Sequence, residues 1–145
     1  MRPRAIVLLI ALLCCIAPTF AEAPATASAT RHPIDVTVDR LLEEDQSTHG
    51  QIRAFGKGCE LWDQELNRAY AETMQLLGKT EPARKALKEA QRAWLAFRDK
   101  EYAALAAIYE TKDGTMYRPM QVADRMEIVK ARAQQLAGTA SLLKD

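Results

Sequence analysis

Hydrophobic residues in the middle of the chain recur every three or four positions, as they do on one face of an α-helix. The first series comprises Ile52, Phe55, Cys59, Trp62, Leu66, Ala69, Thr73 and Leu76. After the turn sequence Gly-Lys-Thr-Glu-Pro, a second series comprises Leu87, Ala90, Trp94, Phe97, Glu101, Ala104 and Ile108. A long helix with one apolar stripe is stable only when that stripe packs on another element. We therefore expect two long helices that pack on each other or on a third, with Trp62 and Trp94 in the core.

Capping and turn residues predict where these two helices begin and end. Thr48 followed by Gln51 matches a capping box, which predicts the start of the first helix. Gly78 suits its C-terminal end, and Pro82 is compatible with the first turn of the second helix.

A shorter helix and a last long helix flank this pair. The spacing of Ile34, Val38, Leu41 and Leu42 predicts a short amphipathic helix over 34–45. The sequence around Gly114 predicts a turn, after which a last helix begins at Thr115 or Pro119 and ends at Gly138. No strand pattern is present. The predicted fold is all-α, an antiparallel helical bundle of three long helices plus a short N-terminal helix.

The first 33 residues have the composition of export and linker segments. Arg2 and Arg4 precede an apolar run over 5–17 that is short for a membrane span, which predicts a signal peptide at 1–21. Residues 22–33, rich in Ala, Pro, Thr and Ser, predict a flexible leader, and 34–145 the helical domain.

Two other interpretations of the N-terminus are an uncleaved anchor and a lipoprotein. Lipidation requires a small residue just before the modified cysteine, and neither Cys14 nor Cys15 follows one. We expect a periplasmic or secreted protein with no membrane span after signal cleavage.

Cleavage after Ala21 also changes the charge. It removes Arg2 and Arg4 and leaves 18 basic residues against 19 acidic ones, a net charge near −1. This balance argues against nucleic acid and against anionic lipid as partners. Cys59 is then the remaining cysteine, so an internal disulfide is excluded. Cys59 is either a buried thiol on the helical stripe or a site of pairing between chains.

The titratable residues do not form a recognisable catalytic or metal-binding motif. His32 lies in the leader and His49 at a helix start, and neither HExxH nor CxxCH occurs. We therefore expect no metal and no cofactor. Glu101 lies on the apolar stripe, where we expect it to turn toward solvent or to meet a basic residue such as Lys57. An enzyme that uses Glu101 is the least favoured interpretation.

A turn centred near residue 80 makes the two middle helices mirror images about it. Asp63 then lies level with Arg98, and Tyr70 with Gln91. We expect an Arg–carboxylate pair at the first level and a hydroxyl–amide hydrogen bond at the second. These contacts either fix the register of the helices or meet a ligand or partner.

The turn before the last helix has an unusual composition. It contains Met116, Tyr117 and Arg118, and Tyr and Arg are enriched at protein interfaces. The segment either packs over the end of the bundle or forms a partner-binding patch.

The two middle helices carry a paired motif. The chain here resembles the LprI-like lysozyme-inhibitor family, whose hallmark is D-x-x-L-N-x-x-Y followed by A-Q-R-A-W and R-D. The matching positions, with the neighbouring Trp62, are Asp63, Leu66, Asn67, Tyr70, Gln91, Trp94, Arg98 and Asp99. The resemblance runs from about residue 48 to 136.

The resemblance implies a secreted or periplasmic helical domain, and for one branch a lipoprotein that inhibits lysozyme. From the chain as a whole we expect a binding module and not an enzyme. Two departures weaken the transfer of the inhibitor function: Tyr102 stands where many family members have a cysteine, so a family disulfide is missing, and the lipobox expected of the inhibitory branch is absent. Two functions are expected. The first is a binding protein that inhibits a lysozyme-type muramidase, and the second is an envelope protein-interaction module without lysozyme activity. The oligomeric state stays open.

Overall fold

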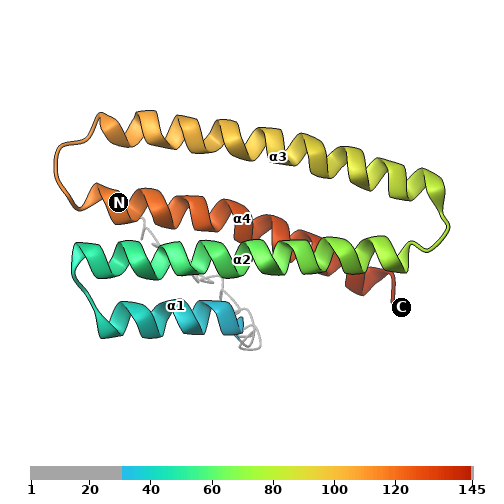
Figure 1. Ribbon diagram of the computed structural model, residues 1–145, viewed down its shortest axis with the longest axis horizontal. Helices are drawn as coiled ribbons and strands as arrows, with labels where there is room; N and C mark the ends of the chain where they lie inside the picture. Colours follow the sequence, from blue (N-terminus) through green and yellow to red (C-terminus); the bar gives the residue numbers. More distant parts are fainter. Residues whose placement is uncertain (1–30, 145) are drawn as a thin grey trace, which may run out of the picture. The chain divides into compact units, whose positions relative to one another are not determined.

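The computed structural model describes residues 31–144, and the compact unit begins at Arg31. It contains α1 (Pro33–Glu44), α2 (Thr48–Leu76), α3 (Glu81–Glu110) and α4 (Tyr117–Leu142) (Figure 1). No strand occurs within these residues, so the predicted fold class is confirmed. The expected signal peptide at 1–21 and most of the expected leader at 22–33 lie outside the described residues.

The N-terminus of α2 is capped differently from the prediction. Ser47 is the N-cap, and its Oγ accepts a hydrogen bond from the backbone N–H of Gly50 at 3.1 Å. Gln51 donates its side-chain amide to the backbone oxygen of Gln46 at 2.9 Å. The predicted capping box is therefore wrong: the backbone N–H of Gln51, which the Thr48 hydroxyl would have capped, donates to the backbone oxygen of Ser47 at 2.9 Å.

Glycine behaves as predicted at two turns and not at a third. Gly78 (φ 55°) follows the end of α2 and Gly114 (φ 112°) lies in the α3–α4 turn, and both adopt the left-handed backbone region that favours glycine. Gly138 does not end α4, which continues to Leu142. The last turn stays helical because Ala140, beyond the glycine, is buried against the rest of the bundle.

The core lies mainly between α2 and α4, which run in the same direction (Figure 1). Helix α1 packs along the N-terminal half of α2. The buried cluster consists of Val38, Trp62, Leu66, Ala69, Met126, Val129, Ala133 and Leu136. The apolar stripe of α2 is thus covered by α4. Of the two expected arrangements, α2 packs on a third helix and not mainly on α3.

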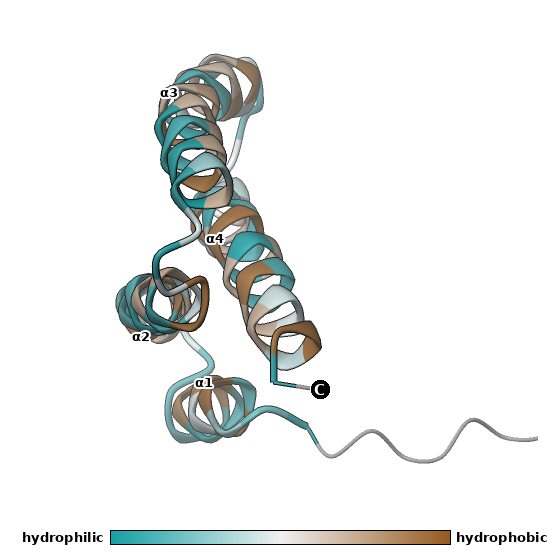
Figure 2. Ribbon diagram, turned by 90° about the vertical axis from the view of Figure 1, so that its right-hand side faces the viewer, coloured by the Kyte–Doolittle hydropathy of each residue, from teal (hydrophilic) through white to brown (hydrophobic). Residues whose placement is uncertain are grey.

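Helix α3 lies at the edge of the bundle and packs mainly on α4 (Figure 2). Gln91 is its buried residue, and Leu87, Trp94 and Tyr102 are partly buried against the core. The expectation that the whole apolar stripe of α3 packs inward is wrong, since four of its seven residues are exposed: Ala90, Phe97, Ala104 and Ile108. Phe97 is 51% and Ile108 57% exposed, because α4 already covers the stripe of α2.

Within residues 31–144, no helix is both long enough and apolar enough to cross a membrane.

Candidate functional site

The paired motif gathers along an open groove between α2 and α3, called here the motif groove. Its volume is about 410 Å³. The residues that line the motif groove are Asp63, Leu66, Asn67, Tyr70, Lys88, Gln91, Arg92, Leu95 and Arg98. Six motif positions therefore lie on one surface, since the heptad spacing puts residues 63, 66, 67 and 70 on one side of α2.

The predicted pairing of Asp63 with Arg98 is present but loose. Arg98 Nη1 lies 4.0 Å from Asp63 Oδ1, at the outer limit for an ion pair. The nearer partner of Arg98 is Asp99, at 2.8 Å, while Asp63 accepts a hydrogen bond from Asn67 Nδ2 at 3.2 Å. Asp63 and Arg98 therefore lie at one level, as the mirror about the turn predicts, and the bidentate contact is not formed.

The predicted hydrogen bond between Tyr70 and Gln91 is wrong. The Oε1 atom of Gln91 accepts from Arg132 Nε at 3.0 Å instead. Arg132 belongs to α4, and the sequence pattern gave no sign that α4 would supply the partner at this level. Burial of Arg132 lowers the pKa of its guanidinium, so the amide oxygen of Gln91 replaces part of the lost hydration.

Alternating arginine and aromatic side chains join α3 to α4. The guanidinium carbon of Arg98 lies 5.6 Å from the Trp94 ring centre and 5.7 Å from that of Tyr102. From α4, Arg125 lies 4.7 Å from Tyr102, and Arg132 lies 5.9 Å from Trp94. These are cation–π distances. Our sequence reasoning missed this row, although the i, i+4 spacing of Trp94, Arg98 and Tyr102 was a usable signal.

Tyr102 replaces the cysteine that many relatives are expected to carry. Its hydroxyl donates a hydrogen bond to the backbone oxygen of Arg125 at 3.3 Å, and its ring contacts the core. Burial raises the pKa of Tyr102. A noncovalent contact between α3 and α4 thus exists at this position.

We expect the Asp63–Arg98 pair to add little to stability. A double-mutant cycle with Asp63→Ala and Arg98→Ala should give a coupling free energy below about 0.5 kcal/mol, because the pair is long and half-exposed. The comparison cycle uses Asp35 and Lys130, which are 2.9 Å apart and more buried, and should give about 1 kcal/mol. Urea unfolding measures both. A larger coupling for Asp63–Arg98 would assign it the register-fixing role.

The second candidate surface is the α3–α4 turn with the start of α4, called here the loop patch. It consists of Met116, Tyr117, Arg118 and Met120. Met116 is 63% and Met120 45% exposed, Arg118 is exposed and Tyr117 half-buried. The two methionines and Arg118 therefore do not pack over the end of the bundle. Their exposure leaves the other possibility for this turn, a partner-binding patch.

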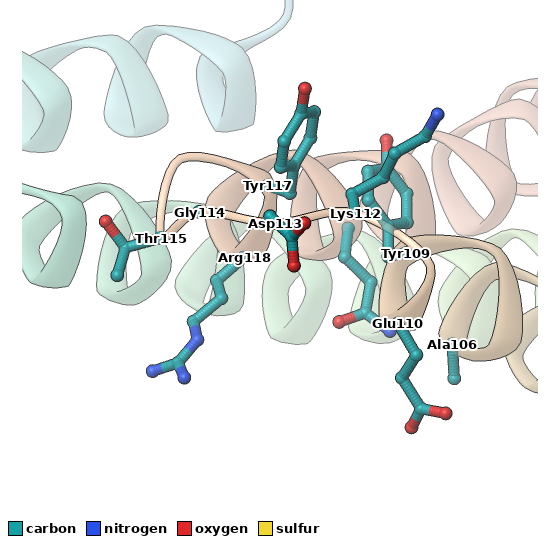
Figure 3. A pocket seen from close by; sticks show the side chains of 10 residues that line it. Ala106, Tyr109, Glu110, Lys112, Asp113, Gly114, Thr115, Tyr117 and Arg118 are labelled. Carbon is teal, nitrogen blue, oxygen red and sulfur yellow. The ribbon is translucent and has the colours of Figure 1, made fainter.

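Tyr117 and Arg118 of the loop patch are among the residues that line an open depression of about 420 Å³ (Figure 3). Tyr109 and Tyr117 line it, with ring centres 6.5 Å apart. The Tyr109 hydroxyl donates to Asp124 Oδ2 at 2.6 Å, and this bond raises the pKa of Tyr109. In Figure 3, Arg118 extends away from the ribbon on the side opposite to Tyr117. The tyrosines fix the turn and leave Arg118 available.

The residues considered for catalysis are not assembled into a reaction site. Glu101 is half-buried and makes no ion pair within residues 31–144, and Lys57 pairs with Glu60 at 3.0 Å instead. In the described part of the chain, no group of three His, Cys, Asp or Glu residues is placed to hold a metal ion. His49 is exposed on α2.

Cys59 is half-buried and unpaired in the described structure. Its Sγ lies 3.8 Å from the backbone oxygen of Val122, to which the thiol donates. Burial raises the pKa of this thiol, which disfavours the reactive thiolate. This environment supports the structural interpretation of Cys59.

Comparison with known proteins agrees with the paired motif. Residues 42–136 match the model of the family described as lysozyme inhibitor LprI. Among solved structures, the fold is similar to that of an uncharacterized protein from Burkholderia thailandensis, with a TM-score of 0.73 and 33% identity. That match covers 79% of this chain and 56% of the other, so this chain spans just over half of that protein's length. No curated protein matches the chain.

Proposed function

Because the chain belongs to the LprI lysozyme-inhibitor family, we propose that it is an exported binding protein that inhibits a lysozyme-type muramidase. The observation that carries this proposal is the loop patch, which presents methionine, tyrosine and arginine side chains at one end of the bundle. The proposed location is the periplasm or the exterior of the cell.

Arg118 is the residue that suits a muramidase cleft. Glycoside hydrolases use two carboxyl groups on either side of the bond they cleave. Arg118 is exposed and makes no ion pair within residues 31–144, so its guanidinium is available to a carboxylate. Guanidinium–carboxylate pairs are directional and charge-assisted, and they strengthen when water is excluded. An arginine placed between the two acids blocks the substrate and neutralises the catalytic groups.

The neighbouring side chains provide apolar contact. Met116 and Met120 are flexible and polarisable, which suits an irregular cleft wall. Tyr117 is held against Tyr109, which is itself bonded to Asp124. A turn that is already ordered loses less conformational entropy on binding, which favours affinity.

A cell-wall clearance assay with lysozyme tests the proposal. The protein should slow clearance in proportion to its concentration, and Arg118→Ala or Tyr117→Ala should each weaken inhibition about 30-fold, as expected for central interface residues. Lys79→Ala is the control, because Lys79 is also an exposed cation but lies in the α2–α3 turn, outside the loop patch and the motif groove, and inhibition by this variant should be unchanged. Undiminished clearance at large excess of the unaltered protein contradicts the proposal.

The second candidate is an envelope interaction module without lysozyme activity. The lipobox that the resemblance implies for the inhibitory lipoprotein branch is absent, and Tyr102 stands where many family members have a cysteine, which favours this candidate. Capture of one stoichiometric partner from periplasmic extract, lost in the Tyr117→Ala/Arg118→Ala variant while lysozyme stays active, supports this candidate over the first.

A further inference from the structure

Helix α3 carries an apolar stripe that no other described helix covers, called here the outer stripe. Its residues are Ala86, Ala90, Ala93, Phe97, Ala104 and Ile108, all exposed. Their spacing of three, four and seven positions places them along one side of the helix. Gln91 and Tyr102, which contact α4, lie on a different side. In Figure 2, α3 lies at the edge of the bundle, beyond α4.

Two exposed charges flank the outer stripe. Glu89 and Lys100 are eleven residues apart, which is close to three helical turns, so they project from the same side of α3. Neither makes an ion pair within residues 31–144. Their opposite charges are therefore available to another molecule, as are the charges of Lys85, Lys88 and Arg92 on the same helix.

We propose that the outer stripe binds a second copy of this chain, with the two α3 helices antiparallel about a two-fold axis midway between residues 94 and 95. In an antiparallel pair of this symmetry, residues on the same side of the two helices face each other. Glu89 of each copy then lies level with Lys100 of the other, which gives two equivalent ion pairs. Closed two-fold dimers are the commonest oligomers, and their interfaces are self-complementary in this way.

The same register also matches the sizes of the apolar residues. Phe97 of one copy lies between Ala90 and Ala93 of the other, where small side chains leave room for its ring. Ala104 lies beside Ala86 of the second copy, so the helices can approach closely near both ends of the contact. Phe97, which is 51% exposed in the monomer, is thereby covered.

The expected dimer is a dissociable one. A stable interface commonly buries about 800 Å² on each partner, and one helical face supplies less than that. The proportion of dimer should therefore rise with protein concentration. This inference is independent of lysozyme inhibition, because the outer stripe and the loop patch share no residue.

Sedimentation of the purified protein over a range of concentrations tests the register through charge reversal. Lys100→Glu or Glu89→Lys alone should raise the dimer dissociation constant about tenfold or more, because each turns two attractions into two repulsions. The double variant Glu89→Lys/Lys100→Glu restores opposite charges and should return the constant to within about threefold of the original.

Phe97→Glu is a second, independent variant. It should leave only monomer while keeping the circular dichroism spectrum of the unaltered protein, since the side chain is half-exposed in the monomer. The proposal is overturned if the unaltered protein sediments as a monomer at every concentration, which would leave the stripe to a different protein. It is also overturned if the double reversal fails to restore the dimer.

Discussion

Replacing Trp62 with alanine should lower the free energy of unfolding by about 3–5 kcal/mol, the largest effect expected from one substitution in this chain. Trp62 is 1% exposed at the junction of α1, α2 and α4. The His32 ring lies 4.4 Å from its ring, and Lys130 Nζ 5.6 Å. Its removal leaves a cavity that these neighbours cannot fill, because His32 also caps α1 and Lys130 is bonded to Asp35. Urea unfolding followed by circular dichroism measures the loss.

Trp94→Ala is the matched control for this prediction. Trp94 is partly buried and lies on α3, where it contacts the core from the edge of the bundle. Its replacement should cost about 1–2 kcal/mol, since less apolar surface returns to water. If the two substitutions cost the same, then α3 shares the core equally with α4, contrary to the packing described here.

The difference between the two tryptophans shows what helical periodicity can and cannot predict. The pattern placed both on apolar stripes, and it correctly indicated helices for the segments that contain them. Periodicity does not say which helix lies opposite a stripe. Parallel packing of α2 on α4 buries small residues such as Ala69 and Ala133, both 0% exposed in the core cluster, and the spacing does not show that these two helices would meet.

The candidate site was predictable to a similar extent. The mirror about the turn correctly brought Asp63 near Arg98, because that geometry depends only on the length of the turn. The partner of Gln91 could not be predicted, because Arg132 comes from a helix outside the mirrored pair. His32 was assigned to the leader, yet it caps α1 through Nδ1 and stacks on Trp62, a role that depends on tertiary contact.

Gly58→Val should lower the free energy of unfolding by about 1–3 kcal/mol, because it overfills a tight junction of three helices. Gly58 is buried in α2, where an added Cβ atom would lie 2.3 Å from Met126 Sδ and 2.8 Å from Val38 Cγ2. Met126 can bend away, but Val38 is stiff and holds α1 on the bundle. We therefore expect the substitution to loosen α1 first, with faster amide hydrogen exchange in α1 than in α4.

Gly56→Ala, two residues earlier in the same helix, separates this steric effect from helix propensity. Nothing lies within 4 Å of a Cβ atom added at Gly56, so alanine should raise the free energy of unfolding by about 0.5–1 kcal/mol. Opposite signs for the two substitutions show that Gly58 is required by the close approach of α1 and α4, whereas Gly56 only weakens α2. If Gly58→Val leaves the free energy of unfolding unchanged, then α1 does not pack tightly on α2.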